Sequence, residues 1–152
     1  MLDKWSEINS IKDKHFLLFW LAEAYMFKGE YKLALYYMLH KLTQDMYEEM
    51  AKAEKARVYR KLACYFYLLD DKDNFQKMLD CAFREDALNG WYYMIKGITT
   101  FIDTQDLKKA VKEIHISLRI YTMGDQPDID GFKDCYQFIY STFEEKMKSL
   151  FT

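Results

Sequence analysis

The side chains best suited to chemistry, three histidines and three cysteines, are scattered along the chain. No His-x-x-x-His, Glu-x-x-His or Cys-x-x-Cys spacing occurs, so a metal site has no local pattern. A Cys–His pair brought together by the fold remains open, although a buried structural cysteine is the commoner case. The residues concerned are His15, His40, His115, Cys64, Cys81 and Cys135.

Other sequence patterns give little support for a catalytic site either. The chain has no glycine-rich phosphate loop and no Gly-x-Ser-x-Gly turn. The acidic pairs Glu48-Glu49 and Glu144-Glu145 are typical of exposed helix residues. We therefore expect a protein that is not an enzyme and has neither cofactor nor metal.

Composition and charge limit the classes of binding partner and the cellular compartment that we expect. Twenty-two basic residues against 24 acidic ones give the 152-residue chain a net charge of −2, which argues against nucleic acid as a partner. No apolar run reaches the roughly 18 residues of a membrane span. The first 15 residues lack the apolar core of a secretory signal, and three distant cysteines suit reduced thiols. We expect a cytoplasmic protein without a membrane partner.

The elements that must position any site are helices. Glycine and proline are scarce, and apolar residues recur at steps of three and four. The predicted helices span residues 15–28, 31–42, 55–69, 74–85, 91–102, 106–121 and 129–151. The segment 43–54 is also helical in pattern and either lengthens the second helix or begins the third.

A repeat underlies these helices. In LAEAYMFKGEYKLALYYMLHKL, Ala22 lets a partner helix approach, Gly29 ends the first helix and Ala34 packs where the two helices cross. Together with Leu21, Tyr25 and Leu42, this spacing resembles the tetratricopeptide repeat (TPR), a helix–turn–helix unit of about 34 residues. The predicted copies span about 15–48, 56–89 and 90–122.

The second and third copies depart from the family pattern. Asp70 replaces the turn glycine and Phe75 replaces the small residue of the crossing. The third copy places Gly97 and Ala110 suitably, but its register is uncertain by one position. An ordinary helical bundle with chance spacing is therefore the alternative interpretation.

The resemblance implies an all-α fold: a right-handed superhelix of about three TPR-like antiparallel helix pairs, forming a single domain over 1–152. The last pair would leave an apolar face in water, so a capping helix over 129–151 is expected to cover it. Phe132, Tyr136, Ile139 and Phe143 are the residues predicted to do so.

In the TPR family, fixed positions of each first helix line a concave groove that holds part of another protein. Carried onto this sequence, these positions are Phe16, Phe19, Glu23, Met26, Arg57, Arg60, Cys64 and Tyr67, followed by Tyr92 and Ile95 or, in the other register, Trp91 and Met94. Aromatic and Met side chains suit an apolar ligand, and Arg suits an acidic residue or a free C-terminus. The alternative is that residues 1–12 fold back and bury Phe16, Phe19 and Met26.

The implied function is protein–protein interaction, as an adaptor, a small chaperone or an assembly factor. Size and repeat number are similar to those of TPR chaperones of secreted bacterial translocators, although no motif supports that subfamily. The family's clamp for heat-shock tails is absent, because Phe19 and Glu23 replace its Lys and Asn.

Three alternatives remain open. The first is a sensor or regulator that binds a short signalling peptide, and the second is pairing with a second copy as a homo-oligomer. The third concerns the basic run 52–61, which is typical of a solvated helix face but would also suit an acidic partner.

Overall fold

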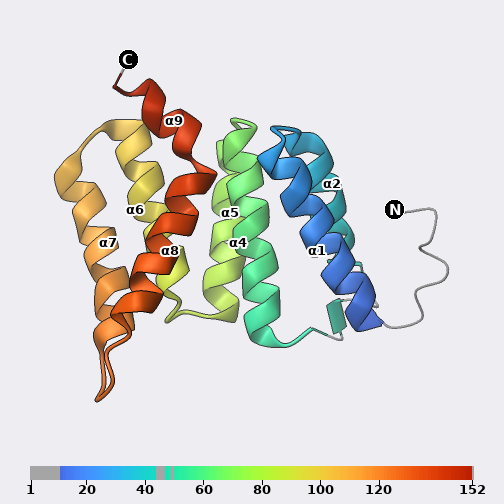
Figure 1. Cartoon of the computed structure of the whole chain (residues 1–152), viewed down its shortest axis with the longest axis horizontal. Coiled ribbons are helices and arrows are strands. Elements are labelled where there is room, and N and C mark those ends of the chain that lie inside the picture. Colours follow the sequence, from blue (N-terminus) through green and yellow to red (C-terminus); the bar gives the residue numbers. More distant parts are fainter. Residues whose placement is uncertain (1–10, 44–46, 49, 152) are drawn as a thin grey trace. The chain divides into compact units, whose positions relative to one another are not determined.

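A computed structural model describes residues 11–43, 47–48 and 50–151, and every regular element within them is an α-helix (Figure 1). The chain divides into an N-terminal unit, Met1–Glu85, and a C-terminal unit, Asp86–Thr152. The N-terminal unit holds α1 (Ile11–Phe27), α2 (Tyr31–His40), α4 (Lys52–Leu68) and α5 (Lys72–Glu85). The C-terminal unit holds α6 (Gly90–Thr104), α7 (Leu107–Thr122), α8 (Ile129–Thr142) and α9 (Glu144–Ser149).

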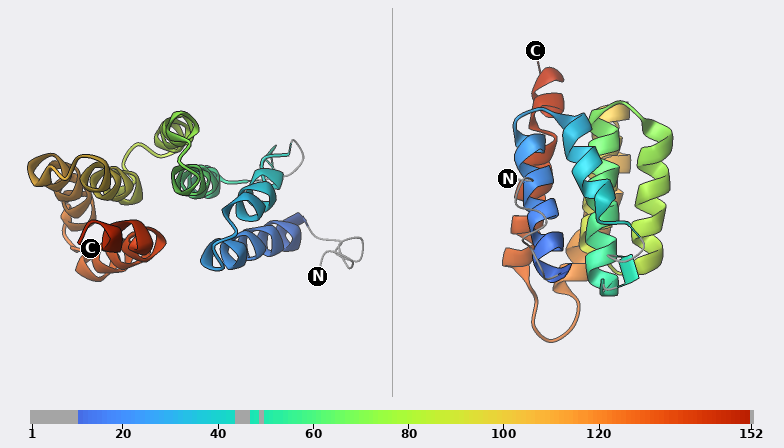
Figure 2. Two further views of the ribbon diagram at one scale, coloured as in Figure 1. Left: turned by 90° about the horizontal axis from the view of Figure 1, so that it is seen from above. Right: turned by 90° about the vertical axis from the view of Figure 1, so that its right-hand side faces the viewer.

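The first six predicted helices are confirmed as three antiparallel pairs, with ends that differ by a few residues. The pairs are α1 with α2, α4 with α5, and α6 with α7 (Figure 2). Of the ambiguous segment 43–54, only residues from Lys52 onward belong to α4, and part of the rest lies outside the described residues.

Each pair turns at a residue in the left-handed backbone region. Gly29 has φ +82°, Asp70 has φ +60° and Gln105 has φ +55°. After Gly29, the N–H of Glu30 donates to the Tyr25 carbonyl at 2.9 Å. The N–H of Asp71 makes the same bond to Phe66 at 2.9 Å. Asp70 thus takes the place of the turn glycine, because a short polar side chain tolerates this conformation better than most.

Small residues lie where paired helices approach closely. Ala22 and Ala34 are fully buried between α1 and α2. A Cβ atom added to Gly97 of α6 would lie 2.5 Å from Cγ1 of Ile114 and 3.1 Å from the Ala110 carbonyl oxygen of α7. The backbones of α6 and α7 can therefore approach this closely only with glycine at this position.

The core of the N-terminal unit joins α1, α2 and α4. The α2 helix packs against α4 as well as against α1, and aromatic, Met and aliphatic side chains fill the space between them. The buried members are Phe19, Ala22, Met26, Ala34, Met38, Met50, Val58, Leu62 and Tyr65.

The C-terminal unit closes with two helices, and here the prediction of one helix over 129–151 is wrong. The α8 helix packs against α6 and α7 but ends at Thr142, and α9 begins at Glu144. Cys135, Ile139 and Phe143 are buried, whereas Tyr136 is exposed. Ile139 and Phe143 are thus buried as predicted and Phe132 is half-buried. Tyr136 is the exception, and it stacks on Tyr140 with ring centroids 6.0 Å apart.

Candidate partner-binding surface

Most of the residues predicted to line a groove are buried. Two have substantial exposure: Phe16 is 66% exposed and the Arg57 side chain is 44% exposed. The buried ones are Phe19, Glu23, Met26, Arg60, Cys64, Tyr67, Tyr92 and Ile95, together with Met94 of the other register, whereas Trp91 is half-buried. These nine side chains are not accessible to a partner in this structure, and their role in binding stays a prediction.

Glu23 shows what one such residue does instead. One carboxylate oxygen of Glu23 lies 3.1 Å from Nζ of Lys61, and the other accepts a hydrogen bond from the Tyr65 hydroxyl. All three side chains are buried, so α1 and α4 are joined by a polar cluster inside the N-terminal unit.

Burial dominates the electrostatics of this cluster. Desolvation lowers the pKa of the Lys61 ammonium, although the Glu23 carboxylate opposes that shift. Burial and the same carboxylate raise the pKa of the Tyr65 hydroxyl. Burial also raises the pKa of the neighbouring Cys64 thiol to about 12, so the thiol is neutral and unsuited to nucleophilic attack near neutral pH.

Phe19 is surrounded by cations. Its ring centroid lies 3.9 Å from Cζ of Arg57, 5.5 Å from Nζ of Lys41 and 6.0 Å from Nζ of Lys61. Such contacts stabilise a cation over the negative face of an aromatic ring. They fix the Arg57 guanidinium beside α1.

One carboxylate serves two of these cations. Glu54 lies 3.1 Å from Lys41 and 3.1 Å from Arg57. Lys41 is itself fully buried and also donates to the His15 carbonyl at 2.8 Å, and desolvation lowers the pKa of its ammonium. Arg57 is thus the solvent-facing member of a charged group that also holds Lys41, Lys61, Glu54 and Glu23.

The solvent side of α1 carries large aromatic side chains. Phe16, Trp20 and Phe27 are 66%, 53% and 63% exposed, at steps of four and seven residues along the helix. We call these three residues the α1 aromatic face. Trp20 contacts Phe16 and Phe19 edge-on, with centroids 6.2 and 5.3 Å apart, which connects this face to the cations around Phe19.

Sequence reasoning missed Trp20 and Phe27, although a signal for them exists. The α1 segment is apolar on nearly every side, a pattern typical of a helix that is covered all round. Within the described residues α1 packs mainly against α2, so one apolar side stays in solvent. The alternative that residues 1–12 cover Phe16 concerns a segment of which residues 1–10 lie outside the described residues.

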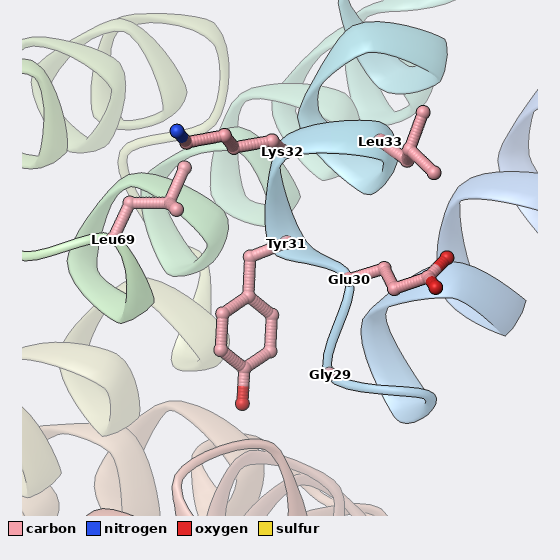
Figure 3. A pocket seen from close by; sticks show the side chains of 6 residues that line it. All are labelled: Gly29, Glu30, Tyr31, Lys32, Leu33 and Leu69. Atoms are coloured by element: carbon pink, nitrogen blue, oxygen red, sulfur yellow. The ribbon is translucent and has the colours of Figure 1, made fainter.

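The hollows of the described surface offer little for chemistry. One, of about 410 Å³, lies beside the α1–α2 turn and is lined by Gly29, Glu30, Tyr31, Lys32, Leu33 and Leu69. Glu30 and Lys32 extend in opposite directions there, so their charges do not converge (Figure 3). A second, of about 390 Å³, lies along α8 at Tyr136, Gln137, Tyr140 and Ser141.

The described residues form neither a metal-binding cluster nor a membrane-spanning helix. No group of three or more His, Cys, Asp or Glu side chains in the described chain could hold a metal ion. Each described helix is too short or too polar to cross a bilayer. Comparison with protein-family models, curated proteins and solved structures gave no match to this chain.

Proposed function

We propose that this chain is a TPR-like protein-interaction module that holds a helix of a partner protein against the α1 aromatic face. The observation that carries the proposal is the distribution of apolar residues on α1. Phe19 and Met26 are buried in the core, while Phe16, Trp20 and Phe27 remain in solvent on an adjacent face of the same helix.

Three exposed aromatic rings on one helix are costly to leave in water. Burying an aromatic side chain contributes on the order of 1.5–3 kcal/mol, so covering this face would supply substantial binding energy. Aromatic residues also dominate the energetics of protein interfaces. An amphipathic helix fits such a face, because its own apolar residues recur every three or four positions.

Arg57 determines which chemical group of a partner the site would prefer. Its guanidinium is half-exposed, lies on Phe19 and shares the Glu54 carboxylate with Lys41. A carboxylate on the partner would pair with the exposed part of the guanidinium. The proposed ligand is therefore an apolar helix that carries an acidic residue.

The TPR-like arrangement rests on the three helix pairs. Each pair ends its first helix at a left-handed residue, Gly29, Asp70 or Gln105, and small residues lie at the crossings of the first and third pairs. These shared features favour a repeat over an unrelated bundle. Adaptor, small chaperone and assembly factor are all uses of such a module.

The test is selection of ligands from two displayed libraries, one of 16-residue helix-forming peptides and one of extended peptides of five to ten residues. Full-length protein should retain helix-forming peptides with Leu, Phe or Met anchors and an Asp or Glu. Their affinity should fall at least tenfold in Phe16→Ser/Trp20→Ser/Phe27→Ser. The matched control is Leu88→Ser/Phe151→Ser, which removes exposed apolar side chains elsewhere.

Circular dichroism should show the same helix content in both variants. Equal affinity of the triple variant and the wild-type protein would contradict the role of α1. Selection of short extended peptides alone would favour the alternative of a sensor for a signalling peptide.

A further inference from the structure

The solvent side of α7 carries a basic stripe that the α1 aromatic face does not involve. Lys108, Lys112, His115 and Arg119 are all exposed and follow one another at steps of four, three and four residues. These steps keep the side chains on one face of a helix over a length of roughly 16 Å. We call these four residues the α7 basic stripe.

The charge of α7 departs from that of the chain. The α7 helix holds one acidic residue, Glu113, and four residues with a formal positive charge, Lys108, Lys109, Lys112 and Arg119. Its formal net charge is therefore +3. The whole chain has a net charge of −2. Within the described residues no side-chain hydrogen bond or ion pair engages Lys108, Lys112 or Arg119. Their charges are therefore available to an outside group.

Apolar residues border the stripe on both sides, with Leu107 and Val111 on one flank and Ile116, which is 40% exposed, on the other. Leu107 is 64% exposed and Val111 is 50% exposed, and the helical period places both between the stripe and the buried face that holds Ala110 and Ser117. A partner that lies along the stripe would therefore meet positive charges in the middle and apolar edges beside them.

We infer that α7 is a second interaction surface, which binds an acidic amphipathic helix of a protein partner. Carboxylates at matching steps would face Lys108, Lys112 and Arg119, and apolar side chains on one flank would contact Leu107 and Val111. Charge complementarity of this kind speeds association and sets the register of the partner.

The arrangement of charges favours a protein over a membrane or a nucleic acid. A helix that lies in a membrane surface has apolar residues at the centre of its buried face and cations at the edges, the reverse of this order. Single-stranded nucleic acid is held by exposed aromatic rings beside cations. The exposed residues of α7 include no Phe, Tyr or Trp side chain.

The experiment measures fluorescence anisotropy of a labelled 16-residue helical peptide with the full-length protein. The peptide carries Glu at positions matching the stripe and Leu along one flank. We expect binding that weakens as salt rises and that falls at least tenfold in Lys112→Glu/Arg119→Glu. The matched control, Lys77→Glu/Lys133→Glu, makes the same change in total charge at exposed lysines of α5 and α8 and should bind as the wild-type protein does.

A charge exchange makes the test specific. The same peptide with Lys in place of Glu should bind Lys112→Glu/Arg119→Glu more tightly than it binds the wild-type protein. A scrambled peptide of equal composition should bind at least tenfold more weakly than the original. Equal binding by the scrambled peptide, or equal loss in the control variant, would overturn the assignment.

Two further probes decide the class of partner. Vesicles of phosphatidylserine and phosphatidylcholine, and a 20-nucleotide single strand, replace the peptide. Tighter binding of either probe than of the peptide, with the same dependence on Lys112 and Arg119, would overturn the protein assignment. Because these variants leave Phe16, Trp20 and Phe27 intact, failure here is distinguishable from failure of the α1 surface.

Discussion

The ammonium group of Lys61 lies 3.1 Å from a carboxylate oxygen of Glu23, and both side chains are buried between α1 and α4. The two residues are 38 positions apart in the chain. Removing one member of a buried ion pair leaves the other charge without compensation, which costs far more than an exposed pair contributes.

Glu23→Ala should therefore lower the free energy of unfolding by about 3–5 kcal/mol, measured by urea denaturation. The double variant Glu23→Gln/Lys61→Met should recover most of that loss, because it removes both charges and keeps an acceptor for Tyr65. Glu48→Ala is the control, since Glu48 is exposed. A loss below about 1 kcal/mol in Glu23→Ala would contradict the buried pair.

The buried thiol of Cys64 is expected to lower the stability of the protein at alkaline pH. Its burial raises the pKa of the folded-state thiol to about 12, whereas the unfolded thiol ionises near its ordinary value. This contribution to stability is complete below the unfolded pKa and is lost as the pH rises toward 12. Between about pH 8 and about pH 10.5, the wild-type protein should lose about 2 kcal/mol more stability than Cys64→Ala.

The measurement is urea denaturation of both proteins at each pH. Desolvation and Glu23, the larger causes of the Lys61 and Tyr65 pKa shifts, are present in both proteins, so most of the difference between the two profiles comes from the thiol. Parallel pH profiles of the two proteins would show that the Cys64 thiol does not ionise on unfolding in this range.

The turn between α6 and α7 predicts a stabilising substitution. Gln105 has φ +55° and donates its N–H to the Phe101 carbonyl at 2.8 Å. A residue with a Cβ atom is strained in this conformation, and glycine is not. Gln105→Gly should raise the free energy of unfolding by about 0.5–1 kcal/mol. Gln105→Ala, which keeps the Cβ atom, should give no increase, and equal effects of the two would contradict the strain.

The helix pairs could be predicted from the sequence because their signals are local. Steps of three and four residues and Gly29 indicated where helices run and where the first one ends. The break in the closing helix at Phe143 has no such signal, because 129–151 keeps a helical pattern throughout. The stripe correctly predicted the burial of Ile139 and Phe143, but the exposure of Tyr136 depends on how α8 packs against α6 and α7.

The candidate site was harder to predict, because the family's groove positions say nothing about local burial. The family pattern places Glu23 in a groove, yet Glu23 pairs with Lys61 and Tyr65 from a helix far along the chain. Trp20 and Phe27 were missed, although apolar residues on two adjacent faces of α1 indicate a helix that needs two partners.

A substitution at Ala34 can test whether α1 and α2 approach each other closely. The Ala34 side chain is fully buried in the core that also holds Ala22 and Phe19, so a larger side chain has no free volume there. Ala34→Phe should lower the free energy of unfolding by about 1–3 kcal/mol, through displaced side chains and helices that move apart.

The matched control is Ala24→Phe, which adds the same ring at an exposed position of α1. Its thermal unfolding midpoint should stay close to that of the wild-type protein, whereas the midpoint of Ala34→Phe should fall by several degrees. The two substitutions have the same change in volume and hydrophobicity, so only packing separates them. Equal midpoints for the two variants would mean that α1 and α2 do not meet at Ala34, and the first helix pair would have to be abandoned.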